Sequence, residues 1–190
     1  MQTNRMDIHG HGTGIRYQFG LTLLELLITI ALAAILLVGG IPAFGSFVTK
    51  QRMKAAVSNL HSDLLMARSQ AVYQNKVVVA CPSPGGKECS GGSDWSHGWI
   101  VFEDDNRDRQ RQQSELLLRH VQSPAQVVIL SPVNRREIRF FPDGSAPGSN
   151  ASISLCGQDG PPGARKLVIS NIGRIRRDTF ETIESGRCPA

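Results

Sequence analysis

The stretch Gly20-Leu21-Thr22-Leu23-Leu24-Glu25-Leu26-Leu27-Ile28-Thr29-Ile30 decides how the rest of this sequence is interpreted. It opens an apolar run from Leu21 to Val48, which contains 28 residues and a single charge. As a helix, this run would be about 42 Å long, more than the roughly 30 Å of bilayer hydrocarbon. We therefore predict a membrane-spanning helix over residues 21–48, preceded by a polar leader (1–20) and followed by a head domain (49–190).

The one acid in the run, Glu25, requires an explanation. A charged side chain at the centre of a bilayer costs roughly 2.5–3.5 kcal/mol on insertion scales, and such residues are usually functional. We therefore expect Glu25 to acquire a cationic partner. Pro42, preceded by two glycines, is expected to interrupt the helix near its middle.

A second apolar pattern continues the helix to about residue 75. Apolar residues recur at spacings of four, three, four, three and four, which is one face of an amphipathic helix: Met53, Val57, Leu60, Leu64, Ala67 and Ala71. We assign the other faces to Lys50, Arg52, Lys54, His61, Asp63 and Arg68.

After Asn75 the sequence changes to short β-like runs separated by turns. We predict strands at 76–81, 98–103, 115–121, 126–131, 137–141, 151–156 and 166–170, with turns at 82–86, 142–144 and 160–163. A long N-terminal helix followed by antiparallel strands predicts an α+β fold, in which the helix packs on the sheet of a β-rich head (76–190).

Four cysteines follow the apolar run: Cys81, Cys89, Cys156 and Cys188. An even number in an exported domain favours disulfides, and four cysteines permit three connectivities. Zinc is the alternative, but the sequence has no Cys-x-x-Cys pair. We predict disulfides and no metal site.

Gly20 followed by Leu21 and an apolar run with an acid at its fifth position resembles the signal of type IV prepilins and pseudopilins. The resemblance implies that prepilin peptidase cuts after Gly20 and that the new amine of Leu21 is methylated. It also implies that this amine neutralises Glu25 of a neighbouring subunit, which makes other pilin subunits partners. The head would then lie outside the inner membrane, and finally on an extracellular pilus.

The head itself resembles the FimT/GspH family of minor pilins and pseudopilins. The residues that carry this resemblance are 67–72, 79–83, Cys89, Asp94-Trp95 and 98–102. Within that family, Cys81 would pair with Cys89 and Cys156 with Cys188. Trp95 and Trp99 are expected to anchor the sheet.

The segment Gly173-Arg174-Ile175-Arg176 is the strongest candidate binding site. In an extended chain Arg174 and Arg176 share one face, about 6.6 Å apart, and two guanidinium groups so placed can contact successive phosphates. The motif resembles the Gly-Arg-x-Arg of the DNA-binding FimT branch of the family, which implies non-specific binding of duplex DNA in natural transformation. Electrostatics adds Arg165, Lys166 and Arg177 to the predicted interface. The alternative is a structural minor pilin that primes assembly, or a type II secretion pseudopilin.

Residues 104–115 carry acids at positions 1, 5 and 12 and an asparagine at position 3, as calcium loops do, but arginine replaces the glycine required at position 6. We therefore interpret this segment as a solvated hairpin turn. No catalytic constellation is present, and we expect neither an enzyme nor a cofactor.

Overall fold

The computed structural model describes residues 22–157 and 160–179, with the backbone alone described at 37–44, 46 and 160–163. The chain divides into two compact units, residues 1–43 and 44–190. The predicted cleavage and methylation positions, Gly20 and Leu21, lie outside the described residues.

Helix α1 (Leu23–Gln74) belongs to both units. It begins at a threonine, because Thr22 Oγ1 accepts a hydrogen bond from the N–H of Glu25 at 3.2 Å. Threonine followed three residues later by glutamate is a helix-start signal, and an acid in the first turn suits the helix dipole. Glu25 is exposed in this unit.

The predicted interruption of α1 at Pro42 is wrong, because the helix is continuous from Leu23 to Gln74. A proline removes one backbone donor, and the helical bonds of the turns before and after it need not be lost. Within the part of the chain that the structure describes, no helix contains a stretch long and apolar enough to cross a membrane. Residues 37–44 of the predicted span are among those described by their backbone alone.

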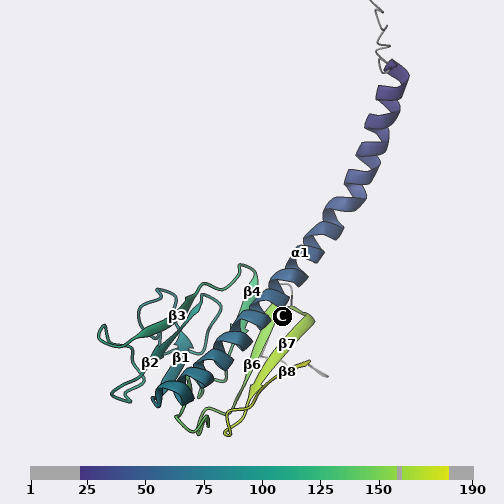
Figure 1. Cartoon of the computed structure of the whole chain (residues 1–190). Helices are drawn as coiled ribbons and strands as arrows, with labels where there is room; N and C mark the ends of the chain where they lie inside the picture. The colour runs from purple at the N-terminus through teal and green to yellow at the C-terminus, as the bar shows by residue number, and fades with distance from the viewer. Residues whose placement is uncertain (1–21, 158–159, 180–190) are drawn as a thin grey trace, which may run out of the picture. The chain divides into compact units, whose positions relative to one another are not determined.

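In the second unit, α1 packs on two four-stranded antiparallel sheets (Figure 1). The first sheet has the order β3-β2-β1-β5 and the second β4-β6-β7-β8. Their bounds are β1 Val78–Pro82, β2 Trp99–Glu103, β3 Leu117–Val121, β4 Val127–Leu130, β5 Ile138–Phe140, β6 Ala151–Gly157, β7 Gly160–Ile169 and β8 Ile175–Thr179. The predicted α+β class, a helix packed on antiparallel sheets, is therefore confirmed.

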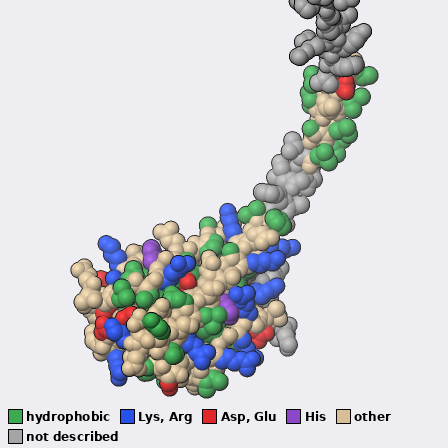
Figure 2. Space-filling view, viewed as in Figure 1, with side chains coloured by type: hydrophobic (Ala, Val, Ile, Leu, Met, Phe, Trp, Pro, Cys, Tyr) green, Lys and Arg blue, Asp and Glu red, His purple; other side chains and the backbone are tan. Residues whose placement is uncertain are grey.

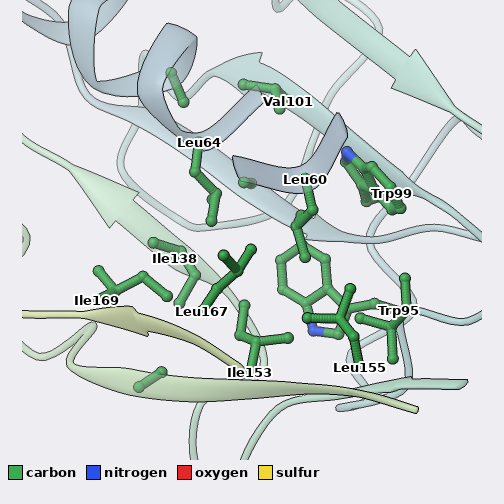
Figure 3. Close-up of a cluster of buried hydrophobic side chains, with 14 of the residues drawn as sticks. Leu60, Leu64, Trp95, Trp99, Val101, Ile138, Ile153, Leu155, Leu167 and Ile169 are labelled. Carbon is green, nitrogen blue, oxygen red and sulfur yellow. The ribbon is translucent and has the colours of Figure 1, made fainter. Parts of the chain in front are cut away.

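One hydrophobic core joins α1 to both sheets. All six residues of the predicted apolar face of α1 are buried, and Leu60 and Leu64 meet side chains from both sheets in Figure 3. Trp95 and Trp99 are fully buried in this core, which confirms their predicted anchoring role. Each indole N–H has an acceptor: Ser131 Oγ at 3.1 Å from Trp95 Nε1 and Asp63 Oδ2 at 2.9 Å from Trp99 Nε1.

Asp63 was predicted on a polar face of the helix, and the structure places it in the core at 5% exposure. Its carboxylate accepts the Trp99 N–H and lies 3.3 Å from Nε of Arg119. Burial raises the pKa of Asp63, and these two donors act in the opposite direction. Periodicity could not reveal this position, because both partners come from distant strands.

The second sheet differs from prediction at its edge. Residues 160–163 were predicted as a turn, but they begin β7, with Gly157 paired to Gly160. The segment after β7 forms an additional strand, β8, that was not predicted. Its run of charges resembles a loop in the sequence, although charged residues are typical of edge strands.

Candidate nucleic-acid interface

The β7–β8 hairpin carries the predicted Gly-Arg-x-Arg motif. Its turn is closed by two backbone hydrogen bonds: Gly173 N–H donates to Ser170 O at 2.9 Å, and Ser170 N–H donates to Arg174 O at 3.0 Å. Gly173 has φ +75°, the left-handed conformation that completes a short hairpin of this kind. The turn itself therefore favours glycine at this position.

Gly173 is also held by its surroundings. It is buried, and a Cβ at this position would collide with the backbone oxygen of Gly144 and lie 3.0 Å from Nε of Arg68. Arg68 Nε in turn donates to Gly144 O at 2.9 Å, and Ala146 N–H donates to Asn171 O at 2.8 Å. In the structure Gly173 therefore both completes the turn and docks the hairpin on its own head.

The register of the hairpin separates the predicted DNA-binding residues onto two faces. Ile175 packs against the core, so Arg174 and Arg176, one residue to either side, point to the opposite face. Lys166 pairs with Asp178, which shares the strand face of Arg176. Arg174 and Arg176 are exposed and Lys166 is partly buried. We call Arg174, Arg176 and Lys166 the outer cluster.

Arg165 and Arg177 lie on the other face, toward α1. They line a groove of about 650 Å³ together with Lys50 and Lys54 from the helix. Arg177 Nη2 lies 3.2 Å from Nδ1 of His61. Burial lowers the pKa of His61, and the charge of Arg177 lowers it further. Lys and Arg side chains gather on the side of the head formed by α1, β7 and β8 (Figure 2).

An acid lies within the outer cluster. Asp178 Oδ2 is 3.9 Å from both Lys166 Nζ and Arg176 Nη2. Among the described residues, the side chain of Arg174 has no ion-pair partner. Asp178 therefore reduces the positive potential at one end of the cluster and leaves Arg174 with its full charge.

Sequence reasoning missed Lys50, Lys54, His61 and Asp178 as neighbours of the arginines. A signal for two of them was present: Lys50 and Lys54 are four residues apart and so share one face of α1. Asp178 follows Arg176 by two residues, the spacing that places it on the same face of a strand. Recognising this signal required β8 to be predicted first.

The remaining predicted sites have mixed outcomes. Cys81 and Cys89 form a disulfide, as the resemblance implied. Cys156 is also disulfide-bonded, but Cys188 lies outside the described residues, so its pairing remains a prediction. Glu25 is described without any neighbouring subunit, and its assembly role stays a prediction.

The segment 104–115 is solvated as predicted over residues 105–110 and 113–114, but its two ends are not. Asp104 and Glu115 are buried, at 1% and 5% exposure. As the side chains stand, no group of three His, Cys, Asp or Glu residues in the described part of the chain is arranged to hold a metal ion.

Comparison with known proteins identifies the family. Residues 56–173 match the family model of the type II transport protein GspH, and residues 15–41 match the prokaryotic N-terminal methylation motif. The first match ends at Gly173, so it includes the glycine of the Gly-Arg-x-Arg motif but neither arginine. No curated protein matched the chain.

Two crystal structures of the type IV minor pilin FimU of Pseudomonas aeruginosa are similar in fold. In the first, the TM-score is 0.51 at 21% identity, over 72% of this chain and 96% of FimU. In the second crystal form, the TM-score is 0.53 at 21% identity, over 75% of this chain and 96% of FimU. The chain thus has a type IV pilin-like fold, and because the GspH model matches more than half of its length, it belongs to the GspH family of type IV pilin-like proteins.

Proposed function

We propose that this pilin-like protein is a minor type IV pilin that binds extracellular duplex DNA non-specifically during natural transformation. The observation that supports binding is the β7–β8 hairpin, whose turn is fixed by Gly173 and whose outer face presents Arg174 and Arg176 exposed. Little backbone ordering is then required when phosphates bind, which favours affinity. The outer cluster contacts the phosphate backbone and leaves the bases unread.

The outer cluster is a better candidate than the groove formed by Arg165 and Arg177. Arg177 already contacts His61, and the groove has Met53 and Val57 among its lining. A duplex is contacted mainly through its phosphates, and these reach exposed side chains on an open face more readily than side chains in a recess. We therefore assign Arg165 and Arg177 a secondary, long-range electrostatic role.

The test is a salt titration of DNA binding by the detergent-solubilised full chain. Loss of both outer arginines (Arg174→Gln with Arg176→Gln) should lower the slope of log K against log salt by up to about 2. The matched control removes the same charge from the other face (Arg165→Gln with Arg177→Gln) and should leave the slope nearly unchanged. Equal losses in both double variants would show a diffuse electrostatic effect and remove the assignment to the outer cluster.

Assembly is proposed to depend on the other unit. The methylation-motif match covers Gly20, Leu21 and Glu25. Cleavage after Gly20 by prepilin peptidase would free the amine of Leu21 to pair with Glu25 of a neighbouring subunit, since an acid in hydrocarbon is costly until a cation reaches it. Residues 21–48 would anchor the protein in the inner membrane until it joins the pilus. Glu25→Ala should leave the protein in the membrane and out of filaments, as assayed on sheared pili.

The second candidate, a pseudopilin of type II secretion, is favoured by the description of the matching family as a type II transport protein. It needs no DNA contact from the outer cluster. A deletion strain separates the two: loss of transformation with normal secretion supports the pilin assignment, and loss of secretion with normal transformation supports the pseudopilin.

A further inference from the structure

The loop between β2 and β3 has an internal frame that its sequence did not reveal. Residues 104–115 connect the two strands, and the two ends of the segment are tied together by Glu115. The carboxylate of Glu115 accepts the N–H of Asp105 at 3.0 Å and the N–H of Gln112 at 2.9 Å. The loop is therefore folded around its own acids.

The backbone of this loop is left-handed at position 6, although the sequence has no glycine there. Calcium loops of this length need a left-handed residue at position 6, normally glycine. Arg109 occupies this position and has φ +69°. Its N–H donates to Asp104 Oδ2 at 3.2 Å, a bond from position 6 back to position 1. The missing glycine thus does not prevent the turn.

Two further side-chain oxygens of the loop accept backbone N–H groups. Asn106 Oδ1 accepts the N–H of Asp108 at 3.0 Å, and Asp108 Oδ1 accepts the N–H of Gln110 at 2.8 Å. Positions 1, 3 and 5 of the loop each use a side-chain oxygen to hold the backbone. Of these three side chains, Asp104 has a second oxygen, Oδ1, without a hydrogen-bond partner.

Independent evidence for a ligand comes from two buried oxygens. Asp104 Oδ1 and Gln112 Oε1, at positions 1 and 9, are buried and have no hydrogen-bond partner. Asp104 is 1% exposed, and a buried polar oxygen without a partner usually indicates a water or ion. Burial raises the pKa of Asp104, the backbone N–H groups of Arg109 and Arg107 lower it, and the nearby charges of Glu115 and Asp108 raise it. A cation between these groups would relieve the two effects that raise the pKa.

The amides of the loop are arranged around the same carboxylate. Asp108 Oδ2 accepts Asn106 Nδ2 at 3.0 Å and Gln112 Nε2 at 2.6 Å. The oxygen and nitrogen of an amide side chain exchange places by a simple flip. A flip of both amides would direct their oxygens to the place where their nitrogens now meet Asp108.

The arginines of the loop bind groups outside it. Arg109 Nη1 lies 3.4 Å from Glu137 Oε1, and Arg111 Nη1 donates to Lys87 O at 2.9 Å. Arg107 is exposed. These contacts draw two of the three guanidinium groups toward neighbouring segments, so their repulsion of a cation in the loop is weakened.

From this geometry we propose that residues 104–115 form a low-affinity calcium site. Its ligands are side-chain oxygens of Asp104, Asn106, Asp108 and Glu115 and the backbone oxygen of Gln110, with Gln112 binding directly or through water. All are oxygen donors, as calcium prefers, and their number exceeds what magnesium accepts from protein. Because the acids are not yet gathered around one point, binding includes the amide flips and rotation of Glu115.

Calorimetric titration of the full chain in non-ionic detergent with calcium chloride tests this proposal. We expect a Kd of about 10⁻⁴–10⁻³ M, the range of extracellular calcium modules, and much weaker binding of magnesium chloride. At 10 mM calcium and a Kd of about 1 mM, the unfolding equilibrium should shift about elevenfold toward the folded state. Absence of calcium binding below about 10 mM would overturn the proposal and assign the buried oxygens to water.

Three variants sharpen the test. Asp108→Asn, at an exposed position, should weaken calcium binding about tenfold or more because it removes one of three ligand charges. Asp105→Asn removes the same charge at position 2, where the carboxylate lies 3.0 Å from Lys76 Nζ, and should leave affinity unchanged. Arg109→Gly should strengthen binding. Equal weakening by Asp105→Asn and Asp108→Asn would indicate general charge attraction and overturn the site.

Discussion

Two charged connections between strands of the head, the β2–β3 loop and the β7–β8 hairpin, are stabilised in opposite ways. In the β2–β3 loop the side chains hold the backbone: Asp104 and Glu115 are buried and accept its N–H groups. In the β7–β8 hairpin the backbone holds the side chains, because Gly173 and the turn's own hydrogen bonds fix it. A charge used to fold its own loop is not available to a macromolecule, whereas Arg174 and Arg176 are not needed to form their turn. This difference is why we assign a small cation to one connection and a polyanion to the other.

The largest expected effect tests whether the hairpin depends on its glycine. Gly173→Ala should lower the free energy of unfolding by about 3 kcal/mol, because a left-handed alanine is strained and its Cβ would collide with the Gly144 backbone. Gly91→Ala is the matched control: it also has a positive φ, of +67°, but its Cβ would meet open space. We expect about 1 kcal/mol there. Urea unfolding followed by tryptophan fluorescence measures both, and equal losses would contradict a docking role for Gly173.

The second-largest effect is expected when the β2–β3 loop loses a side chain that holds its backbone. Glu115→Ala should cost about 2 kcal/mol in the presence of a chelator, since it leaves two N–H groups, those of Asp105 and Gln112, without their acceptor. Glu88→Ala, at an exposed acid, should change stability by less than about 0.5 kcal/mol. If both variants unfold at the same urea concentration, the loop does not depend on its buried acids.

The sequence predicted the parts of this fold that follow a local period. The face of α1 from Met53 to Ala71 and the two anchoring tryptophans were recognisable because apolar burial repeats along the chain. What could not be predicted depends on contacts between distant segments. Asp63 is buried because Trp99 and Arg119 reach it, and β8 is a strand because β7 pairs with its charged residues.

The same limit applies to the two sites. The motif at Gly173 located the hairpin, but the division of its cations between two faces follows from a strand that was not predicted. The calcium pattern was visible in the sequence, but the left-handed conformation of Arg109 at position 6, where glycine is usual, was not. Residue identity restricts backbone conformation statistically, and the surrounding hydrogen bonds decide individual cases.

A smaller effect is expected where an acid interrupts the outer cluster. Asp178→Asn should strengthen DNA binding about threefold, because the carboxylate lies 3.9 Å from both Lys166 and Arg176 and competes with phosphate for them. Glu88→Gln changes net charge equally at an exposed site in the β1–β2 loop and controls for that change. Fluorescence anisotropy at fixed salt compares the two. Equal gains would mean that net charge, and not the outer cluster, determines affinity.

The smallest expected effect is a pH dependence on the face of the hairpin that meets α1. The pKa of His61 is lowered by burial and by Arg177, so the folded state prefers the neutral ring. Its contribution to stability is complete above the ordinary value of 6.5 and is lost as pH falls through the lowered pKa. His61→Gln should therefore flatten the decline in unfolding free energy between about pH 7 and 5. The quantity to measure is the difference in unfolding free energy between the variant and wild type, in which the contributions of the titrating acids cancel. Arg177→Gln removes one of the two causes and should reduce this difference without abolishing it, whereas His97→Gln, at an exposed loop position, should leave it intact. An unchanged difference in Arg177→Gln would mean that burial alone sets the pKa and that Arg177 does not act on the helix.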